Sequence, residues 1–347
     1  MKLTAPPRVL LIAGLAALAL PASAQERELN VYSARHYASD EALYAAFTKA
    51  SGIPIKRIDA DDSAVLARLK SEGSASPADV VLLVDASRLW RAEVDGLFQP
   101  VKSARLEARI PAALRGKDAG DGSQWFGFST RARVIVYNKA SVPRADAETY
   151  AKLGDPVNKG RVCTRSGSHP YNLSLFGAEL EHLGEAKTRS WLSGIVANMA
   201  RPPKGGDTDQ IRAVASGECQ IALTNSYYFA RLMRSTKAED RAVIEKVALV
   251  FPDQAGHGTH VNIAGGAVAR HAKHRDAAVR FLEYLASDDA QRHFADGNNE
   301  WPAVKGLTIT NPALDAMGPF KADTVPVSVI GMNQVKVQRL LDEVGYK

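Results

Sequence analysis

Several common features are missing from this sequence of 347 residues. Beyond the first 24 residues, no segment approaches the run of about 18 apolar residues that a membrane helix needs, so we expect a soluble mature chain. The formal net charge is +6, but no dense block of lysine and arginine is present, which argues against nucleic-acid binding. The G-x-S-x-G, P-loop and dinucleotide-binding glycine motifs are absent, and the acidic residues are scattered rather than paired. These absences give no support to a hydrolase or a nucleotide-binding enzyme.

The first 24 residues have the pattern of a cleavable secretory signal peptide. Lys2 and Arg8 give a basic start, and an apolar run follows from Val9 to Leu20. This run is too short for a membrane span, and residues 21–24 end in an A-x-A cleavage site. We therefore predict cleavage before Gln25 and a periplasmic location.

Cysteine is scarce, because only Cys163 and Cys219 are present. In an exported protein two cysteines most simply form one disulfide, and two buried thiols are the alternative. The bridge would close a loop of about 56 residues, which stabilises a fold by ~4 kcal/mol in the chain-entropy description.

The mature sequence alternates strand-like and helix-like segments. In the first part, strands are expected at 28–36, 54–59 and 79–85, with helices at 40–49 and 63–70 between them. This βαβαβ order predicts a parallel sheet with right-handed crossovers. The second part repeats the theme, with strands expected at 160–165, 219–225 and 246–252 and helices at 174–182, 185–198 and 208–216.

Two long β-rich segments, 126–139 and 259–270, are expected to cross between two α/β lobes. Gly265 and Gly266 lie in the second segment and would give it local freedom. The predicted N-terminal lobe contains residues 25–130 plus 262–312, and the C-terminal lobe contains 131–261 plus 313–347. Two strands that span two lobes form a hinge with a cleft beside it, where ligands bind beyond the strand ends.

The segment TNSYYFARL places Tyr227 and Tyr228 side by side and Arg231 three residues later. Adjacent side chains diverge in a regular strand or helix, so convergence of the two hydroxyls requires the end of an element or a turn. A ligand that binds phenols would explain such an arrangement.

The chain resembles the periplasmic ferric-iron-binding proteins, the substrate-binding components of iron ABC importers. The resemblance covers essentially the whole mature chain and lies in these segments: LNVYSARHY, SPADVVLLVDA, WFGFSTRARVIVYNK, RVCTRSGSHPYNLSL, ALTNSYYFARL and THVNIAGGAV. It implies an α/β, two-lobed periplasmic-binding-protein fold of type II. It also implies capture of Fe³⁺, delivery to an ABC permease in the inner membrane, and a monomer. The chain looks most like the tyrosine-rich branch, which binds iron without relying on an external anion.

The resemblance implies five metal ligands in this chain: His36, Tyr37, Tyr171, Tyr227 and Tyr228. Other members have a glutamate after the P-A-D-V segment, whereas Val84 stands at that position here. Asp85 is adjacent, but alternate strand residues face opposite sides, so we expect it to point elsewhere.

Three arginines are candidates for supporting roles. Arg231 would neutralise the site or orient a phenolate. Arg131 and Arg133 lie in the first crossing segment, and either is a candidate for holding carbonate or phosphate as an extra ligand.

The tyrosine set suits Fe³⁺ on chemical grounds alone. Fe³⁺ is a hard cation that favours anionic oxygen. Free tyrosine titrates near pH 10, and a bound cation lowers that pKa, so binding should release protons and weaken in acid. Fe²⁺ prefers softer nitrogen donors, which makes reduction a route for release.

Two alternatives remain open. The same fold could bind thiamine, a polyamine or an oxyanion, although an oxyanion cleft would need arginines and helix starts. A secreted metal-dependent enzyme is the other, but it would need an open coordination position and a placed acid or base. His257 and His260 form an H-x-x-H pattern in a glycine-rich loop, which is a poor zinc motif without a helix and an acidic partner.

Overall fold

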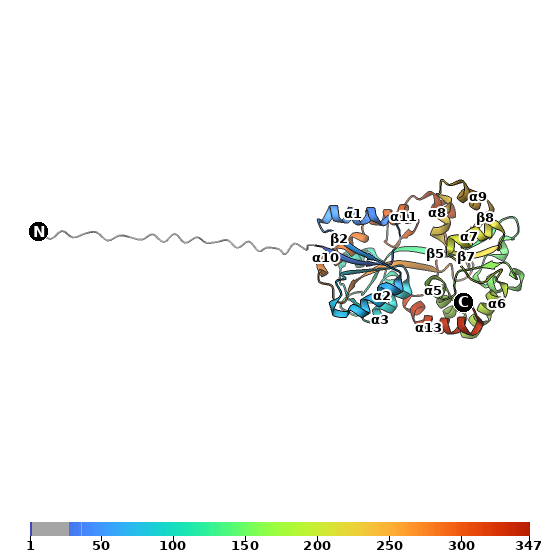
Figure 1. Cartoon of the computed structure of the whole chain (residues 1–347), viewed down its shortest axis with the longest axis horizontal. Coiled ribbons are helices and arrows are strands. Elements are labelled where there is room, and N and C mark those ends of the chain that lie inside the picture. The colour runs from blue at the N-terminus through green and yellow to red at the C-terminus, as the bar shows by residue number, and fades with distance from the viewer. Residues whose placement is uncertain (2–27, 36) are drawn as a thin grey trace.

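The computed structural model describes residue 1, residues 28–35 and residues 37–347. The predicted cleavage site and His36 lie outside the described residues. Two α/β lobes lie side by side and are joined by strands that run through both (Figure 1). No helix among the described residues combines the length and apolar character needed to cross a membrane.

The N-terminal lobe is built on the predicted parallel strands. β1 (Leu29–Ser33) pairs in parallel with β2 (Ile55–Asp59) and with β3 (Val80–Leu83). All four residues of β3 are buried, as expected for a strand covered on both faces. The helices that alternate with these strands are α1 (Asp40–Ser51), α2 (Asp62–Glu72) and α3 (Ala86–Val94).

Two antiparallel strands connect the lobes, as the sequence predicts. β5 (Phe126–Asn138) pairs with β9 (Val261–Ala269) as far as Ala132. From Arg133 onward β5 pairs instead with β7 (Ile221–Asn225). One continuous strand therefore serves the sheets of both lobes.

Gly265 and Gly266 have a different role from the local freedom expected of them. Both lie inside β9, and neither has a positive φ. A Cβ at Gly265 would lie 2.5 Å from the Phe126 carbonyl oxygen, and one at Gly266 would lie 2.7 Å from Leu82 Cδ2. Close packing against backbone therefore requires glycine at position 265, whereas a side chain at position 266 would displace Leu82.

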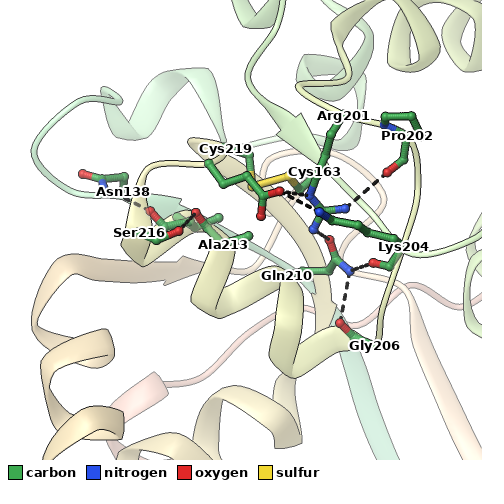
Figure 2. Close-up of a disulfide and its surroundings, with 12 residues drawn as sticks. Asn138, Cys163, Arg201, Pro202, Lys204, Gly206, Gln210, Ala213, Ser216 and Cys219 are labelled. Carbon is green, nitrogen blue, oxygen red and sulfur yellow. Dashed lines mark hydrogen bonds and ion pairs between the residues drawn. A yellow bond between two sulfur atoms is a disulfide. The ribbon is translucent and has the colours of Figure 1, made fainter.

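The C-terminal lobe contains the disulfide, which confirms the prediction from cysteine content. Cys163 in β6 (Val162–Cys163) is bonded to Cys219, which lies two residues before β7. Figure 2 shows Arg201 beside the bridge, with Nη2 donating to Gln210 Oε1 at 3.0 Å. The other elements of this lobe are β8 (Val247–Val250), α5 (Pro170–Leu183), α6 (Glu185–Asn198), α7 (Asp207–Ser216), α8 (Ser226–Met233) and α9 (Ala238–Lys246).

The remaining elements complete both lobes. The long helix α13 (Val327–Val344) packs against α5 and α6 and also against α3, so it contacts both lobes (Figure 1). The others are β4 (Phe98–Gln99), α4 (Ala104–Arg109), α10 (Arg275–Leu285), α11 (Asp288–Asn298), β10 (Trp301–Pro302) and α12 (Pro312–Met317). The exact lobe boundaries stay a prediction.

Candidate metal centre

The paired tyrosines lie at a junction between a strand and a helix. β7 ends at Asn225 and α8 begins at Ser226, so no loop residue separates the two elements. Tyr227 is fully buried and Tyr228 is partly buried, and their ring centroids are 4.2 Å apart with the planes tilted by 30°. This junction supplies the element end that convergence of adjacent side chains requires.

Tyr171 reaches the same place from the first turn of α5. Pro170 begins the helix, a position where its missing N–H costs nothing. His169 caps the helix, because its Nδ1 accepts the Tyr171 backbone N–H at 3.2 Å. The Tyr171 hydroxyl lies 3.2 Å from the Tyr227 hydroxyl. Two segments of the C-terminal lobe thus place their phenol oxygens in contact.

Tyr37 approaches from the N-terminal lobe. Its ring meets the Tyr227 ring edge-on, with centroids 5.9 Å apart and an interplanar angle of 80°. Its hydroxyl donates to Glu300 Oε1 at 3.3 Å, and Glu300 Oε2 accepts from Ser129 Oγ at 2.7 Å. The structure therefore brings phenols of the two lobes together across the cleft.

Burial and mutual proximity both raise the pKa values of three of the phenols. Burial is the largest cause that raises the pKa of Tyr37, Tyr171 and Tyr227. Glu300 and Tyr171 further raise the pKa of Tyr37, whereas Tyr228 further raises that of Tyr171. Without a bound cation these groups are neutral at physiological pH, and a cation among them would reverse the shift.

Arg131 is a buried cation beside these phenols. Its side chain is 1% exposed, and within the described part of the chain none of its three guanidinium nitrogens has a hydrogen-bond partner. Its Cζ lies 5.6 Å from the centroid of the Tyr171 ring. Burial lowers the pKa of Arg131, but Glu300 and the phenols outweigh this and raise it. A buried guanidinium without partners is costly, so its donors are available to an anionic group.

Arg133 has different surroundings although it is only two residues away. Its Nη1 donates to Asp207 Oδ2 at 2.7 Å, and its Nη2 donates to Asn172 Oδ1 at 2.7 Å. These bonds hold α5 and α7 together, so most of its donors are already used. Arg231 lies over the paired tyrosines, with its Cζ 5.3 Å from the centroid of the Tyr228 ring.

Sequence reasoning missed Glu300 and His169. Glu300 is 263 residues from Tyr37, and no local motif connects them. His169 had a signal, because a histidine directly before Pro170 is placed to cap a helix. Burial and the charges of Arg165 and Arg133 lower the pKa of His169 to about 2, so its ring is neutral. Since Nδ1 accepts a hydrogen bond, the proton lies on Nε2, which is a donor rather than a metal ligand.

A cleft of about 620 Å³ opens beside the tyrosines and is lined by Tyr37, Tyr171, His169 and Val84, among others. Val84 therefore forms part of the wall and offers no ligand atom. Asp85 is fully buried, and its Oδ2 accepts from Ser174 Oγ at 2.9 Å. Asp85 thus links α3 to α5 rather than facing the cleft.

The sequence and the fold of this chain are similar to those of bacterial solute-binding proteins. Residues 42–317 match the family described as bacterial extracellular solute-binding protein. Iron uptake protein A2 of Synechocystis is 48% identical, with 94% of this chain and 92% of that protein covered. A Trichodesmium protein solved in complex with iron and citrate superposes with a TM-score of 0.86 at 48% identity, covering 92% of this chain and all of that one.

The ferric iron-binding protein A of Mannheimia haemolytica, solved in an open conformation, has a TM-score of 0.82 and 39% identity over 92% of this chain and 99% of that one. These matches confirm the predicted two-lobed type II fold. The chain belongs to the bacterial extracellular solute-binding proteins, in the group that contains the iron uptake and ferric-binding proteins.

Proposed function

We propose that this protein captures Fe³⁺ in the periplasm and delivers it to the permease of an ABC importer. The observation that carries the proposal is the convergence of four phenols, with the Tyr171 and Tyr227 oxygens 3.2 Å apart. Phenolates are hard anionic donors that match a trivalent cation. The names of the relatives, iron uptake and ferric iron-binding protein, agree with this cargo.

In the proposed complex the following side chains are ligands: Tyr37, Tyr171, Tyr227 and Tyr228. His36, the residue before Tyr37 in the sequence, remains a candidate fifth ligand. Four phenolates exceed the charge of Fe³⁺ by one, and the buried guanidinium of Arg131 offsets that excess. Arg231 stacks on the paired rings and would steady their orientation.

A small anion is a further candidate component of the site. The unpartnered nitrogens of Arg131 are suited to carbonate or to a carboxylate of a chelator. Arg133, the other arginine considered, is less suited because Asp207 and Asn172 occupy its terminal nitrogens.

Closure of the lobes would assemble the site. Tyr37 belongs to one lobe and the other three phenols to the second, so only the closed form offers all four. A permease could then distinguish loaded from empty protein by its shape. The relatives are named for uptake and binding, which supports a carrier over a secreted enzyme.

The proposal is tested by a visible spectrum of purified mature protein during titration with ferric citrate. We expect a phenolate-to-iron charge-transfer band that saturates at one iron per chain and bleaches when dithionite is added. Tyr284→Phe is a matched control, because Tyr284 lies in α10 and its hydroxyl donates to the Leu43 carbonyl. Absence of the band, with no change in melting temperature on adding iron, would contradict the proposal. Thiamine, polyamines and oxyanions would then be screened against the same cleft.

A further inference from the structure

A second group of metal-ligating side chains lies at the far end of α5. His182 of α5, His257 of the loop between β8 and β9, and Asp323 before α13 each place a ligand atom within 4.8 Å of the others. Glu179 and Asp253 form a second such group with His257. We call these five residues the histidine–carboxylate cluster. His182 is eleven residues after Tyr171, which at helical rise is about 16 Å along the helix, so the two sites are separate.

The contacts inside the cluster already pair ring nitrogens with carboxylate oxygens. His182 Nε2 lies 2.9 Å from Asp323 Oδ2, and His257 Nε2 lies 3.3 Å from Glu179 Oε1. The two imidazole rings stack, with centroids 3.7 Å apart and planes 18° from parallel. Ligand atoms around a tetrahedral zinc ion lie about 3.3 Å from one another, given bonds of about 2.0 Å. Only small side-chain shifts separate the present positions from such an arrangement.

The backbone fixes the loop that contains His257 against the segment that contains Asp323. Thr259 N donates to the Lys321 carbonyl at 2.9 Å, and Asp323 N donates to the Thr259 carbonyl at 2.8 Å. Gly258 has φ +101°, and a Cβ there would lie 2.7 Å from the Lys321 carbonyl oxygen, so this close approach requires glycine. Asp323 Oδ1 accepts the Val325 N–H at 3.1 Å, which leaves Oδ2 facing His182.

The charges and the solvent exposure of the cluster's side chains also favour binding of a cation. The Glu179 and Asp323 side chains are 5% and 3% exposed, and each pairs with a histidine. Buried carboxylates are stable when they are paired or when they bind a metal. The His182 and His257 side chains are 23% and 29% exposed, so a cation can reach the cluster from solvent.

We propose that the histidine–carboxylate cluster binds one divalent transition-metal ion of the zinc class, with His182, His257 and Asp323 as ligands. Imidazole nitrogens suit zinc and its neighbours, whereas magnesium and calcium prefer oxygen alone. Three protein ligands leave one position for water or for the nearby Glu179. His257 and His260 do not form a site together, since His257 has its partners in α5 and before α13. His260 is buried elsewhere and donates its backbone N–H to the Tyr150 hydroxyl oxygen.

The test is calorimetric titration of chelator-treated mature protein with Zn²⁺, in iron-free and iron-loaded forms. We expect one zinc per chain in both forms. His182→Ala and His257→Ala should each raise the zinc dissociation constant at least about 100-fold. Loss of an outer-shell partner already weakens metal binding by up to about 100-fold, and these residues are proposed as direct ligands. His271→Ala is the matched control, because His271 is an exposed histidine outside the cluster, and it should bind zinc normally.

Further measurements separate this proposal from the ferric site and from a loss of folding. Tyr228→Phe should bind zinc as the wild type does, which keeps the two proposals independent. The histidine variants should keep the circular dichroism spectrum and melting temperature of the iron-free protein. Failure of wild-type protein to bind zinc would overturn the proposal. So would full zinc binding by the double variant His182→Ala/His257→Ala, or its loss in Tyr228→Phe.

Discussion

The two lobes contribute differently to the tyrosine cluster. The C-terminal lobe provides Tyr171 from the first turn of α5, and Tyr227 and Tyr228 from the first turn of α8, which directly follows β7. The N-terminal lobe provides Tyr37 from the loop after β1, and its hydroxyl is bonded to Glu300. The C-terminal half is therefore preassembled, whereas in the proposed complex Tyr37 would have to exchange its hydrogen bond for a metal bond. We expect the three phenols of the C-terminal lobe to determine most of the affinity for iron, and Tyr37 to couple iron binding to closure of the lobes.

The largest effect should come from removing a phenol of the C-terminal lobe. Tyr171→Phe or Tyr228→Phe deletes an anionic donor from a preassembled set, so ferric affinity should fall by about 100-fold or more, equivalent to about 3 kcal/mol. Competition with citrate, followed through the charge-transfer band, measures this loss. Wild-type affinity in both variants would show that these phenols are packing residues.

Tyr37→Phe should have a smaller effect on affinity and a larger one on shape. We expect about a tenfold loss, equivalent to about 1.4 kcal/mol, because the preassembled phenols of the C-terminal lobe stay intact and the Glu300 hydrogen bond no longer competes. Small-angle scattering should show that iron no longer compacts the variant as it does the wild type. A loss as large as that of Tyr171→Phe would erase the distinction between the two lobes.

Arg131→Met should shift the pH dependence of ferric binding upward. Arg131 lowers the pKa of Tyr37, Tyr171 and Tyr227, opposing the rise caused by burial. Without it the phenols hold their protons more tightly, and Fe³⁺ must displace them at greater cost. The pH of half-loading should rise by about one unit, measured by titrating the band at fixed citrate. An unchanged midpoint would remove Arg131 from the site.

The smallest effect on binding should follow from loss of the disulfide. Cys163 and Cys219 each lie eight residues before a tyrosine of the cluster, Tyr171 and Tyr227 respectively. The disulfide therefore links the two segments that lead to Tyr171 and to Tyr227. Cys163→Ser/Cys219→Ser should cost about 2–4 kcal/mol of stability, seen as a lower melting temperature. The band position should persist with less than about a tenfold loss of affinity. A lost band would mean that the bridge sets the metal geometry itself.

Much of this architecture could be predicted from sequence because its signals are local. Alternating apolar runs and helical spacing located β1 to β3 and the helices α1 and α2, and the long segment 126–139 contained β5. The tyrosine segments could be singled out because each follows a predicted strand. These features depend on neighbours within a few residues.

The rest depends on contacts between distant segments. Arg131 and Arg133 look equivalent in sequence, but β5 changes sheet between Ala132 and Arg133, so their partners differ. Glu300 meets Tyr37 only because the chain returns to the N-terminal lobe. Likewise, His182 meets His257 through the packing of a loop against the segment before α13. The spacing of residues along the chain does not predict such long-range contacts.

The direct passage from Asn225 to Ser226 has a consequence for the speed of exchange. Tyr227 and Tyr228 have no loop on which to swing aside, so a cation bound to these two phenolates would not be released by a local motion of either one. Departure must wait for the whole lobe to move. Removal by an external chelator should then reach a limiting rate as chelator concentration rises, and that limit should be the same for chelators of unrelated structure. The protein itself, rather than the competitor, would set the residence time of its cargo.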